Sequence, residues 1–145
     1  MERVIIAAAI IAVALVVAFV AQRRRTDPPT QATPVRSLPQ QLDREDFAAP
    51  GTTFVVVMFS SDTCDACALV SETVKAIEAP DVAFQNVSWQ ADKKLHARYE
   101  IESVPATVIA GPDGAVGAAF LGTIVEAELV EAMQAFRNRL ADESA

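Results

Sequence analysis

The chain has 145 residues, 52% of them hydrophobic, and a formal net charge of -7 at pH 7. Without residues 1–25, 18 acidic and 8 basic residues remain, and this acidic balance argues against nucleic-acid binding. Two cysteines are too few for a structural disulfide framework. The roughly 120 residues after the first 25 suit one small globular domain.

An uninterrupted apolar run near the N-terminus predicts a transmembrane helix. Residues 4–21 contain no charge, no proline and no glycine. As a helix they would be about 27 Å long, close to the thickness of the hydrocarbon core of a bilayer. A cleaved signal peptide is the alternative, with a weak cleavage site at 16–18. Signal peptides have a basic start and a shorter apolar core. We therefore interpret residues 1–25 as a membrane anchor with its basic flank.

The charges beside this run predict its orientation. Arg23, Arg24 and Arg25 follow it, whereas Arg3 alone precedes it. Positive charge concentrates on the cytoplasmic side of membrane helices, so the bias favours a cytoplasmic location for the soluble domain. The alternative is an extracytoplasmic domain, in which the arginines only reach back to the lipid headgroups.

Residues 26–41 are predicted to be a linker. They contain Pro28, Pro29, Pro34 and Pro39 among polar residues, without apolar periodicity. Such a composition favours extended polyproline-II segments. A proline-rich motif that binds a partner is the sharper alternative, but a spacer explains the composition. The soluble domain is then expected to occupy residues 42–145.

The first elements of this domain surround the two cysteines. Residues 42–48 suggest a short helix. The apolar stretch 53–59, rich in β-branched and aromatic residues, predicts a buried strand. Helical spacing follows from residue 68 to 77. The sequence Cys64-Asp65-Ala66-Cys67 thus lies where a strand passes into a helix.

This location gives the CxxC spacing a chemical meaning. Unpaired N–H groups and the helix dipole at a helix N-terminus stabilise a thiolate, so Cys64 is predicted to be an attacking thiol with a lowered pKa. Two intervening residues place Cys67 one turn later, where it can close a disulfide and release a bound partner. A static disulfide is the plainer interpretation, but such a small loop stabilises little. A structural zinc site needs four ligands, and the chain has a single histidine, His96.

The remainder of the domain alternates strands and helices. Weaker strand signals at 81–88 precede a short helix at 92–99 and an apolar stretch at 101–110. The turn sequence at 111–114 and the segment 115–121 predict a hairpin. A last helix follows Gly122, and Thr123 with Glu126 suggests a capping box for it. Its apolar stripe comprises Val125, Leu129, Met133, Phe136 and Leu140.

Three isolated residues are given plain interpretations. His96 is expected at the surface or half-buried, away from the cysteines. Trp89 is expected in the core or at the edge of a groove. Met58 is expected to fill space in the core.

The order βαβαββα, with CxxC after the first core strand and Ser103-Val104-Pro105 before the hairpin, resembles the thioredoxin family. The resemblance covers roughly residues 42–141. It implies a three-layer α/β/α fold with a mixed central sheet. It also implies that Pro105 is cis and lies against the CxxC, and that the Val104 backbone binds an extended substrate segment as an added strand. The predicted site is therefore Cys64, Cys67, Val104 and Pro105, with no metal.

Several positions depart from the family pattern. The tryptophan that commonly precedes the first cysteine is Thr63, and the usual Gly-Pro pair is Asp65-Ala66. The family's buried acid, thought to help deprotonate the resolving thiol, falls on Met58. Asp65 should oppose thiolate formation at Cys64 through its like charge, and Asp62 should either do the same or cap the helix.

The sequence thus predicts a membrane-anchored thiol–disulfide oxidoreductase, with reduction of protein disulfides favoured over the reverse. It implies no built-in cofactor, disulfide-containing protein substrates, and an electron-donor thiol partner. The alternative is a redox-inactive adaptor of the same fold that binds extended peptides at the Pro105 groove. Met58 and the missing tryptophan motivate this second hypothesis.

Overall fold

The computed structural model describes Met1, Val13 and residues 38–145. Residues 38–145 belong to one compact unit, Arg36–Ala145. The predicted membrane helix at 4–21, apart from Val13, and residues 26–37 of the predicted linker lie outside the described residues. No helix in the described part of the chain is long and apolar enough to cross a membrane.

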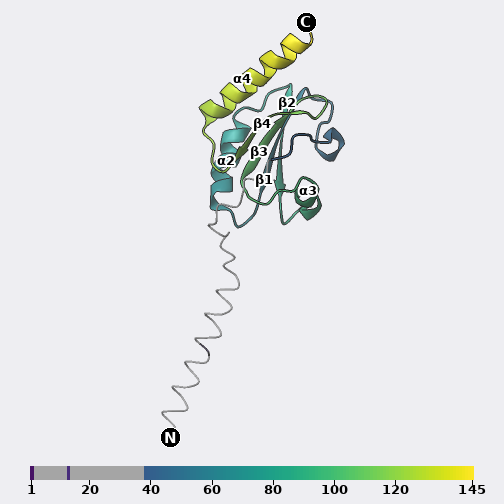
Figure 1. Ribbon diagram of the computed structural model, residues 1–145. Helices are drawn as coiled ribbons and strands as arrows, with labels where there is room; N and C mark the ends of the chain where they lie inside the picture. The colour runs from purple at the N-terminus through teal and green to yellow at the C-terminus, as the bar shows by residue number, and fades with distance from the viewer. Residues whose placement is uncertain (2–12, 14–37) are drawn as a thin grey trace. The chain divides into compact units, whose positions relative to one another are not determined.

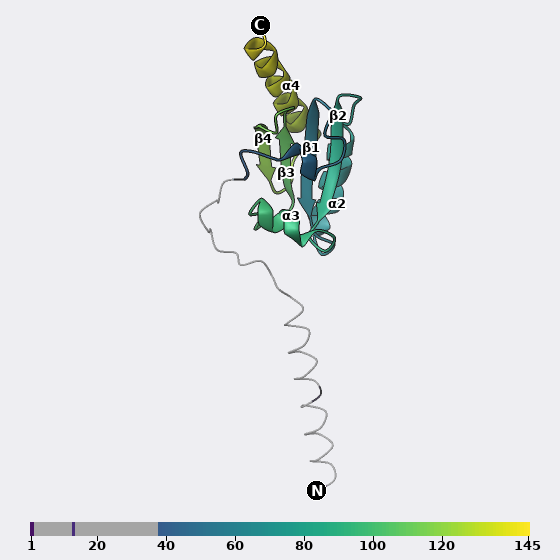
Figure 2. The same cartoon turned by 90° about the vertical axis from the view of Figure 1, so that its right-hand side faces the viewer.

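The central strand of the domain is β1 (Phe54–Ser60), and all seven of its residues are buried. It lies in a four-stranded sheet with the order β2-β1-β3-β4 (Figures 1 and 2). Its uninterrupted apolar sequence is what a strand covered on both faces requires. The predicted strand at 53–59 is confirmed.

The sheet is mixed because its strands are joined in two ways. Helix α2 (Asp65–Lys75) connects β1 to β2 (Val82–Ser88), which pairs with β1 in parallel. Strands β3 (Ala106–Ala110) and β4 (Val116–Leu121) form the predicted hairpin, and β3 pairs with β1 antiparallel. This topology agrees with the predicted βαβαββα order.

Alternate residues of β1 face two separate cores. Phe54, Val56 and Met58 face α2 and the C-terminal helix α4 (Glu126–Glu143). Val55, Val57 and Phe59 face the side covered by α3 (Lys93–Arg98). Figures 1 and 2 show α2 and α4 on one face of the sheet and α3 on the other. The domain therefore has the predicted α/β/α layers.

Residues 38–46 bind through hydrogen bonds to the turn of the β3–β4 hairpin. Gln41 forms a bridge with Ala115, and the Leu42 N–H donates to the Gly114 carbonyl at 2.8 Å. The Arg44 guanidinium is buried and donates to the Gly111 and Thr52 carbonyls at 2.7 and 2.8 Å. The predicted helix at 42–48 is wrong in extent: only a 3-10 turn, η1 (Arg44–Asp46), forms.

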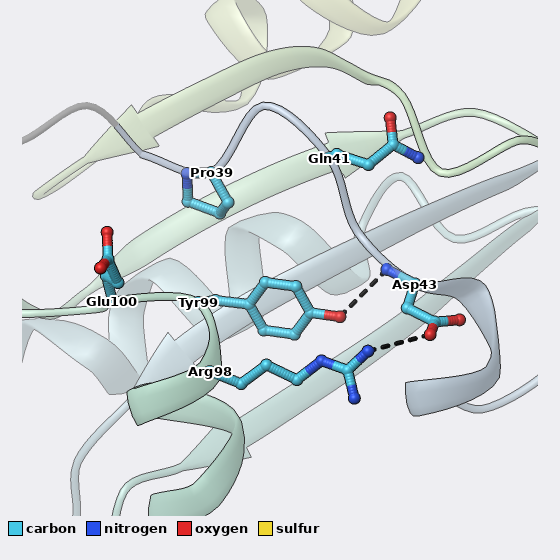
Figure 3. A pocket seen from close by; sticks show the side chains of 6 residues that line it. All are labelled: Pro39, Gln41, Asp43, Arg98, Tyr99 and Glu100. Atoms are coloured by element: carbon cyan, nitrogen blue, oxygen red, sulfur yellow. Dashed lines mark hydrogen bonds and ion pairs between the residues drawn. The ribbon is translucent and has the colours of Figure 1, made fainter.

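Tyr99 joins the same segment to the end of α3. Its hydroxyl accepts from the Asp43 N–H at 3.0 Å and donates to the Asp46 carboxylate at 2.5 Å. Burial, together with the Asp46 carboxylate, raises the pKa of Tyr99 to about 12. Arg98 pairs with both carboxylates, and Figure 3 shows Asp43, Arg98 and Tyr99 lining one pocket with Pro39, Gln41 and Glu100. These contacts hold the segment before β1 against the end of α3.

The start of α4 differs from the prediction. The residue before its first turn is Val125, whose side chain makes no capping hydrogen bond, so the capping box of Thr123 and Glu126 is wrong. Val125 is also 60% exposed, whereas Ile124 is buried in its place. The other predicted stripe residues do face the core: Leu129, Met133 and Phe136 are buried, and Leu140 packs against them.

Candidate functional site

Cys64 and Cys67 lie at the N-terminus of α2 and form a disulfide, with their Cα atoms 5.3 Å apart. Cys64 is the N-cap residue of the helix and is half-buried. Cys67 lies in the first turn and is only 5% exposed, as part of the core on the α2 face. The predicted strand-to-helix location is confirmed. One sulfur lies near the surface and its partner lies inside.

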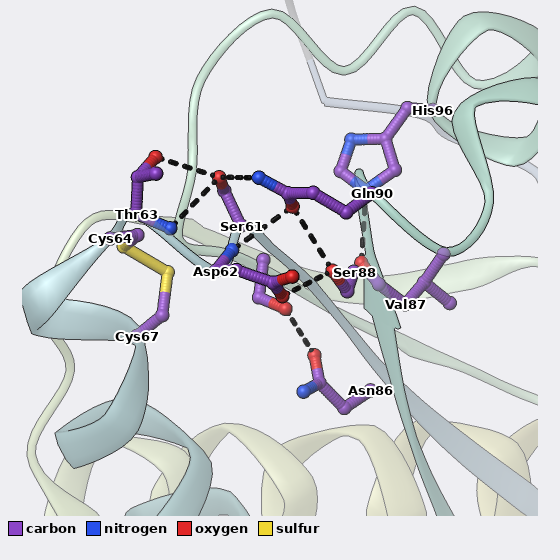
Figure 4. The surroundings of a disulfide bond; sticks show 11 residues. Ser61, Asp62, Thr63, Cys64, Cys67, Asn86, Val87, Ser88, Gln90 and His96 are labelled. Atoms are coloured by element: carbon purple, nitrogen blue, oxygen red, sulfur yellow. Dashed lines mark hydrogen bonds between the residues drawn. A yellow bond between two sulfur atoms is a disulfide. The ribbon is translucent and has the colours of Figure 1, made fainter. Parts of the chain in front are cut away.

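The loop before Cys64 is held by hydrogen bonds to the loop that follows β2. The Gln90 amide donates to the Ser61 hydroxyl at 3.1 Å and accepts from the Asp62 N–H at 3.0 Å. The Ser88 hydroxyl donates to the Asp62 carboxylate at 2.8 Å. Figure 4 shows this network beside the disulfide. Asp62 therefore braces the loop, and its predicted alternative role as a helix cap is wrong because Cys64 occupies that position.

A surface groove runs alongside the disulfide. Both cysteines line it with residues from β1, β2, the first loop and α2: Ser60, Ser61, Asp62, Ala68, Ser71, Glu72 and Asn86. Asp62 and Glu72 are exposed acids at this groove, so its charged side chains are negative. Sequence reasoning missed Asn86 because it lies on another strand, β2. It also missed Glu72, which lies on the same helix as Cys67, because the spacing alone does not show that its side chain lines the groove.

The Val104–Pro105 peptide bond is cis, as the resemblance implied. Val104 is half-buried and packs against the cores on both faces of the sheet, including the one that contains Cys67. Pro105 is buried, and its carbonyl accepts from the Gly122 N–H at 2.8 Å. Their predicted role in binding substrate stays a prediction.

The position of the family's buried acid holds a fully buried methionine in this chain. Met58 has no exposed surface and packs in the core that contains Cys67, so its predicted role as core filler is confirmed. Its cross-strand partners are Asn86 on β2 and Thr107 on β3, and Thr107 is also fully buried. The Thr107 hydroxyl has no hydrogen-bond partner within the described part of the chain. The sequence did not indicate this residue, because the pairing register is not visible in it.

His96 is buried, whereas the sequence predicted a position at the surface or half-buried. It is 2% exposed, its Nε2 lies 2.9 Å from the Val87 carbonyl oxygen, and its ring meets Phe59 edge-on. It lies on the α3 face of the sheet, opposite Cys67. Trp89 is 45% exposed and lines a surface groove. Of its two predicted locations, the core and the edge of a groove, the second is confirmed. In residues 38–145, no group of His, Cys, Asp or Glu side chains gathers that could hold a metal ion.

No protein-family model and no curated protein matches the sequence. Solved structures do match. The thioredoxin of Fasciola hepatica has a TM-score of 0.52 and 27% identity, covering 58% of this chain and 81% of that one. A malarial protein has a TM-score of 0.55 and 15% identity, covering 59% of this chain and 98% of that one.

The likeness to the Fasciola thioredoxin extends from fold to sequence. It coincides with a CxxC pair at bonding distance and a cis proline before β3. A surface cysteine at a helix N-terminus, with a buried partner one turn later, can exchange disulfides with other thiols. The described domain thus has a thioredoxin-like fold and the cysteine pair of a thiol–disulfide oxidoreductase.

Proposed function

We propose that the protein reduces disulfides in protein substrates. The observation that carries this proposal is the unequal placement of the two sulfurs, since Cys64 is half-buried at the start of α2 and Cys67 is buried behind it. The Cys64 thiolate attacks a substrate disulfide and forms a mixed disulfide. Cys67 then attacks Cys64, which releases the substrate thiol and leaves the Cys64–Cys67 disulfide.

An extended substrate segment would bind beside the cysteines at Val104 and Pro105. The half-buried Val104 precedes β3 and packs against the core that contains Cys67, which supports this location. A thiol partner must return two electrons after each turnover, because the exchange converts the CxxC pair into a disulfide. No other cofactor takes part in the proposed cycle.

The test is a trapping experiment with Cys67→Ser. This variant can form the mixed disulfide but cannot resolve it, so it should accumulate a covalent adduct with a disulfide protein such as insulin. Non-reducing electrophoresis detects the adduct, and Cys64→Ser/Cys67→Ser is the matched control. Equal recovery of insulin with both variants, without a covalent band, would support the adaptor hypothesis, for which Met58 and Thr63 are the motivation.

We also propose that residues 4–21 anchor the domain in a membrane and that the domain is cytoplasmic. The length of the apolar run and the three arginines after it support this proposal. Cys64 and Cys67 are the only thiols, so a membrane-impermeant maleimide can report their location after reduction. Labelling only after lysis is expected. Labelling in intact cells would place the domain on the extracytoplasmic side. The protein would then be an electron carrier that receives its electrons from across the membrane.

A further inference from the structure

The Thr107 hydroxyl is an unexplained polar group on the α2 face of the sheet, the face that also carries Cys67. The side chain has 0% exposure, and its oxygen finds no hydrogen-bond partner among the described residues. A buried hydroxyl that makes no hydrogen bond destabilises the fold, and valine would fill the same space without this cost. A group of this kind in a native structure calls for an explanation, and a redox role is one of those available.

The strand register places this hydroxyl on the side of the sheet that carries Cys67. Thr107 is the cross-strand partner of Met58, and directly paired residues share a face of the sheet. Met58 belongs to the same core cluster as Cys67. The flanking β3 residues, Ala106 and Val108, belong to the opposite cluster, which confirms that Thr107 points toward α2.

We propose that the Thr107 hydroxyl donates a hydrogen bond to the Cys67 thiolate when the pair is reduced. This inference rests on the proposed function, in which Cys67 is the resolving thiol. In the disulfide form the Cys67 sulfur carries no charge, and the hydroxyl has no partner. Reduction creates an anionic acceptor in the same core. The hydroxyl would thus support the thiolate at a site where Met58 supplies no acid.

The step balances without another reactant. The Cys67 thiol loses its proton to solvent, and its thiolate attacks the Cys64 sulfur of the mixed disulfide. The Cys64–Cys67 bond forms as the bond between Cys64 and the substrate breaks. The electron pair leaves on the substrate sulfur, which takes a proton from solvent. Thr107 keeps its proton throughout and only donates the hydrogen bond.

Other charges near Cys67 oppose its thiolate. Asp62, from the loop after β1, lines the groove with both cysteines, and Asp65 lies in the first turn of α2. Glu72 of α2 also lines the groove, but it is paired with Lys75 at 3.0 Å. Asn86, from β2, is neutral. Arg137 of α4 pairs with Asp81 and lies over the Phe54 ring, at the other end of β1. A hydroxyl that donates a hydrogen bond to the Cys67 thiolate would therefore offset the repulsion from these acids.

The experiment titrates Cys67 alone in the full-length chain carrying Cys64→Ser, by the ultraviolet absorbance of the thiolate. Adding Thr107→Val should raise the pKa of Cys67 by about one unit, because a hydrogen bond to a charged group is lost. Thr107→Ser keeps the hydroxyl and should restore the titration. Unchanged titration in Thr107→Val would overturn the proposal, and so would equal shifts in both variants.

A second measurement separates this role from a structural one. With both cysteines present, Thr107→Val should leave the melting temperature of the disulfide form equal or higher, since it removes an unpartnered hydroxyl. A purely structural hydroxyl would instead lower it, which would contradict the proposal. Failure of the insulin-trapping experiment would overturn the proposed function without changing the titration, so the two failures can be told apart.

Discussion

Replacing Met58 with Asp should lower the free energy of unfolding by about 3–5 kcal/mol at neutral pH. Met58 has no exposed surface and packs among apolar side chains of the core on the α2 face. The substitution leaves a cavity and buries a carboxyl between two polar cross-strand partners, Thr107 on β3 and Asn86 on β2. Chemical denaturation across a pH series measures the effect.

The pH dependence has a definite sign. Burial raises the pKa of the introduced carboxyl in the folded state above its unfolded value of about 3.9. The destabilisation relative to the unsubstituted protein is therefore smallest below about pH 4 and grows as pH rises toward the folded-state pKa. Met58→Asn has nearly the same size and does not titrate, so its loss should be independent of pH. If the free energies of unfolding of Met58→Asp and Met58→Asn changed with pH in the same way, full burial of position 58 would be contradicted.

Replacing Gly114 with Ala should lower the free energy of unfolding by about 2–4 kcal/mol. Gly114 has a φ of +81°, and a Cβ there would lie 1.9 Å from the Leu42 carbonyl oxygen. The added methyl group must push the strand pairing of residues 40–42 away from the hairpin. Urea denaturation at neutral pH measures the loss.

Gly122→Ala is the matched control for this substitution. Gly122 also has a positive φ, +90°, but nothing lies within 4 Å of the position of its missing Cβ. Its substitution should cost only the backbone strain, about 1–2 kcal/mol. Equal losses at the two glycines would show that residues 40–42 are not held closely against the hairpin.

The sequence predicts this fold wherever one local signal dominates. The apolar run of β1 and the CxxC before a helical pattern define the reactive end of the domain, and the turn at 111–114 defines the hairpin. Local signals fail where the choice depends on tertiary packing. Thr123 has the right spacing for a capping box, but burial of Ile124 starts α4 later. His96 is buried because α3 packs against the sheet beside Phe59. The hydrophilic residues that flank His96 in the sequence do not indicate this burial.

The candidate site divides in the same way. The cysteines and the cis proline could be located from spacing and resemblance. Thr107 could not, because its importance depends on which residue of β1 it faces. Asn86 and Glu72 reach the groove only because β2 and α2 flank β1. Contacts of this kind arise from the pairing of strands and the packing of helices, which a single sequence does not display.

The domain is held at one end of its sheet and reacts at the other. Gln41 and Leu42 attach beside Gly114, next to the first residues of β1, whereas Cys64 follows the last. The seven residues of β1 span about 23 Å between these ends. A protein substrate bound at the cysteines therefore does not occupy the same surface as residues 38–42. Lengthening or shortening the chain before residue 38 should therefore leave the thiol–disulfide chemistry at Cys64 and Cys67 unchanged.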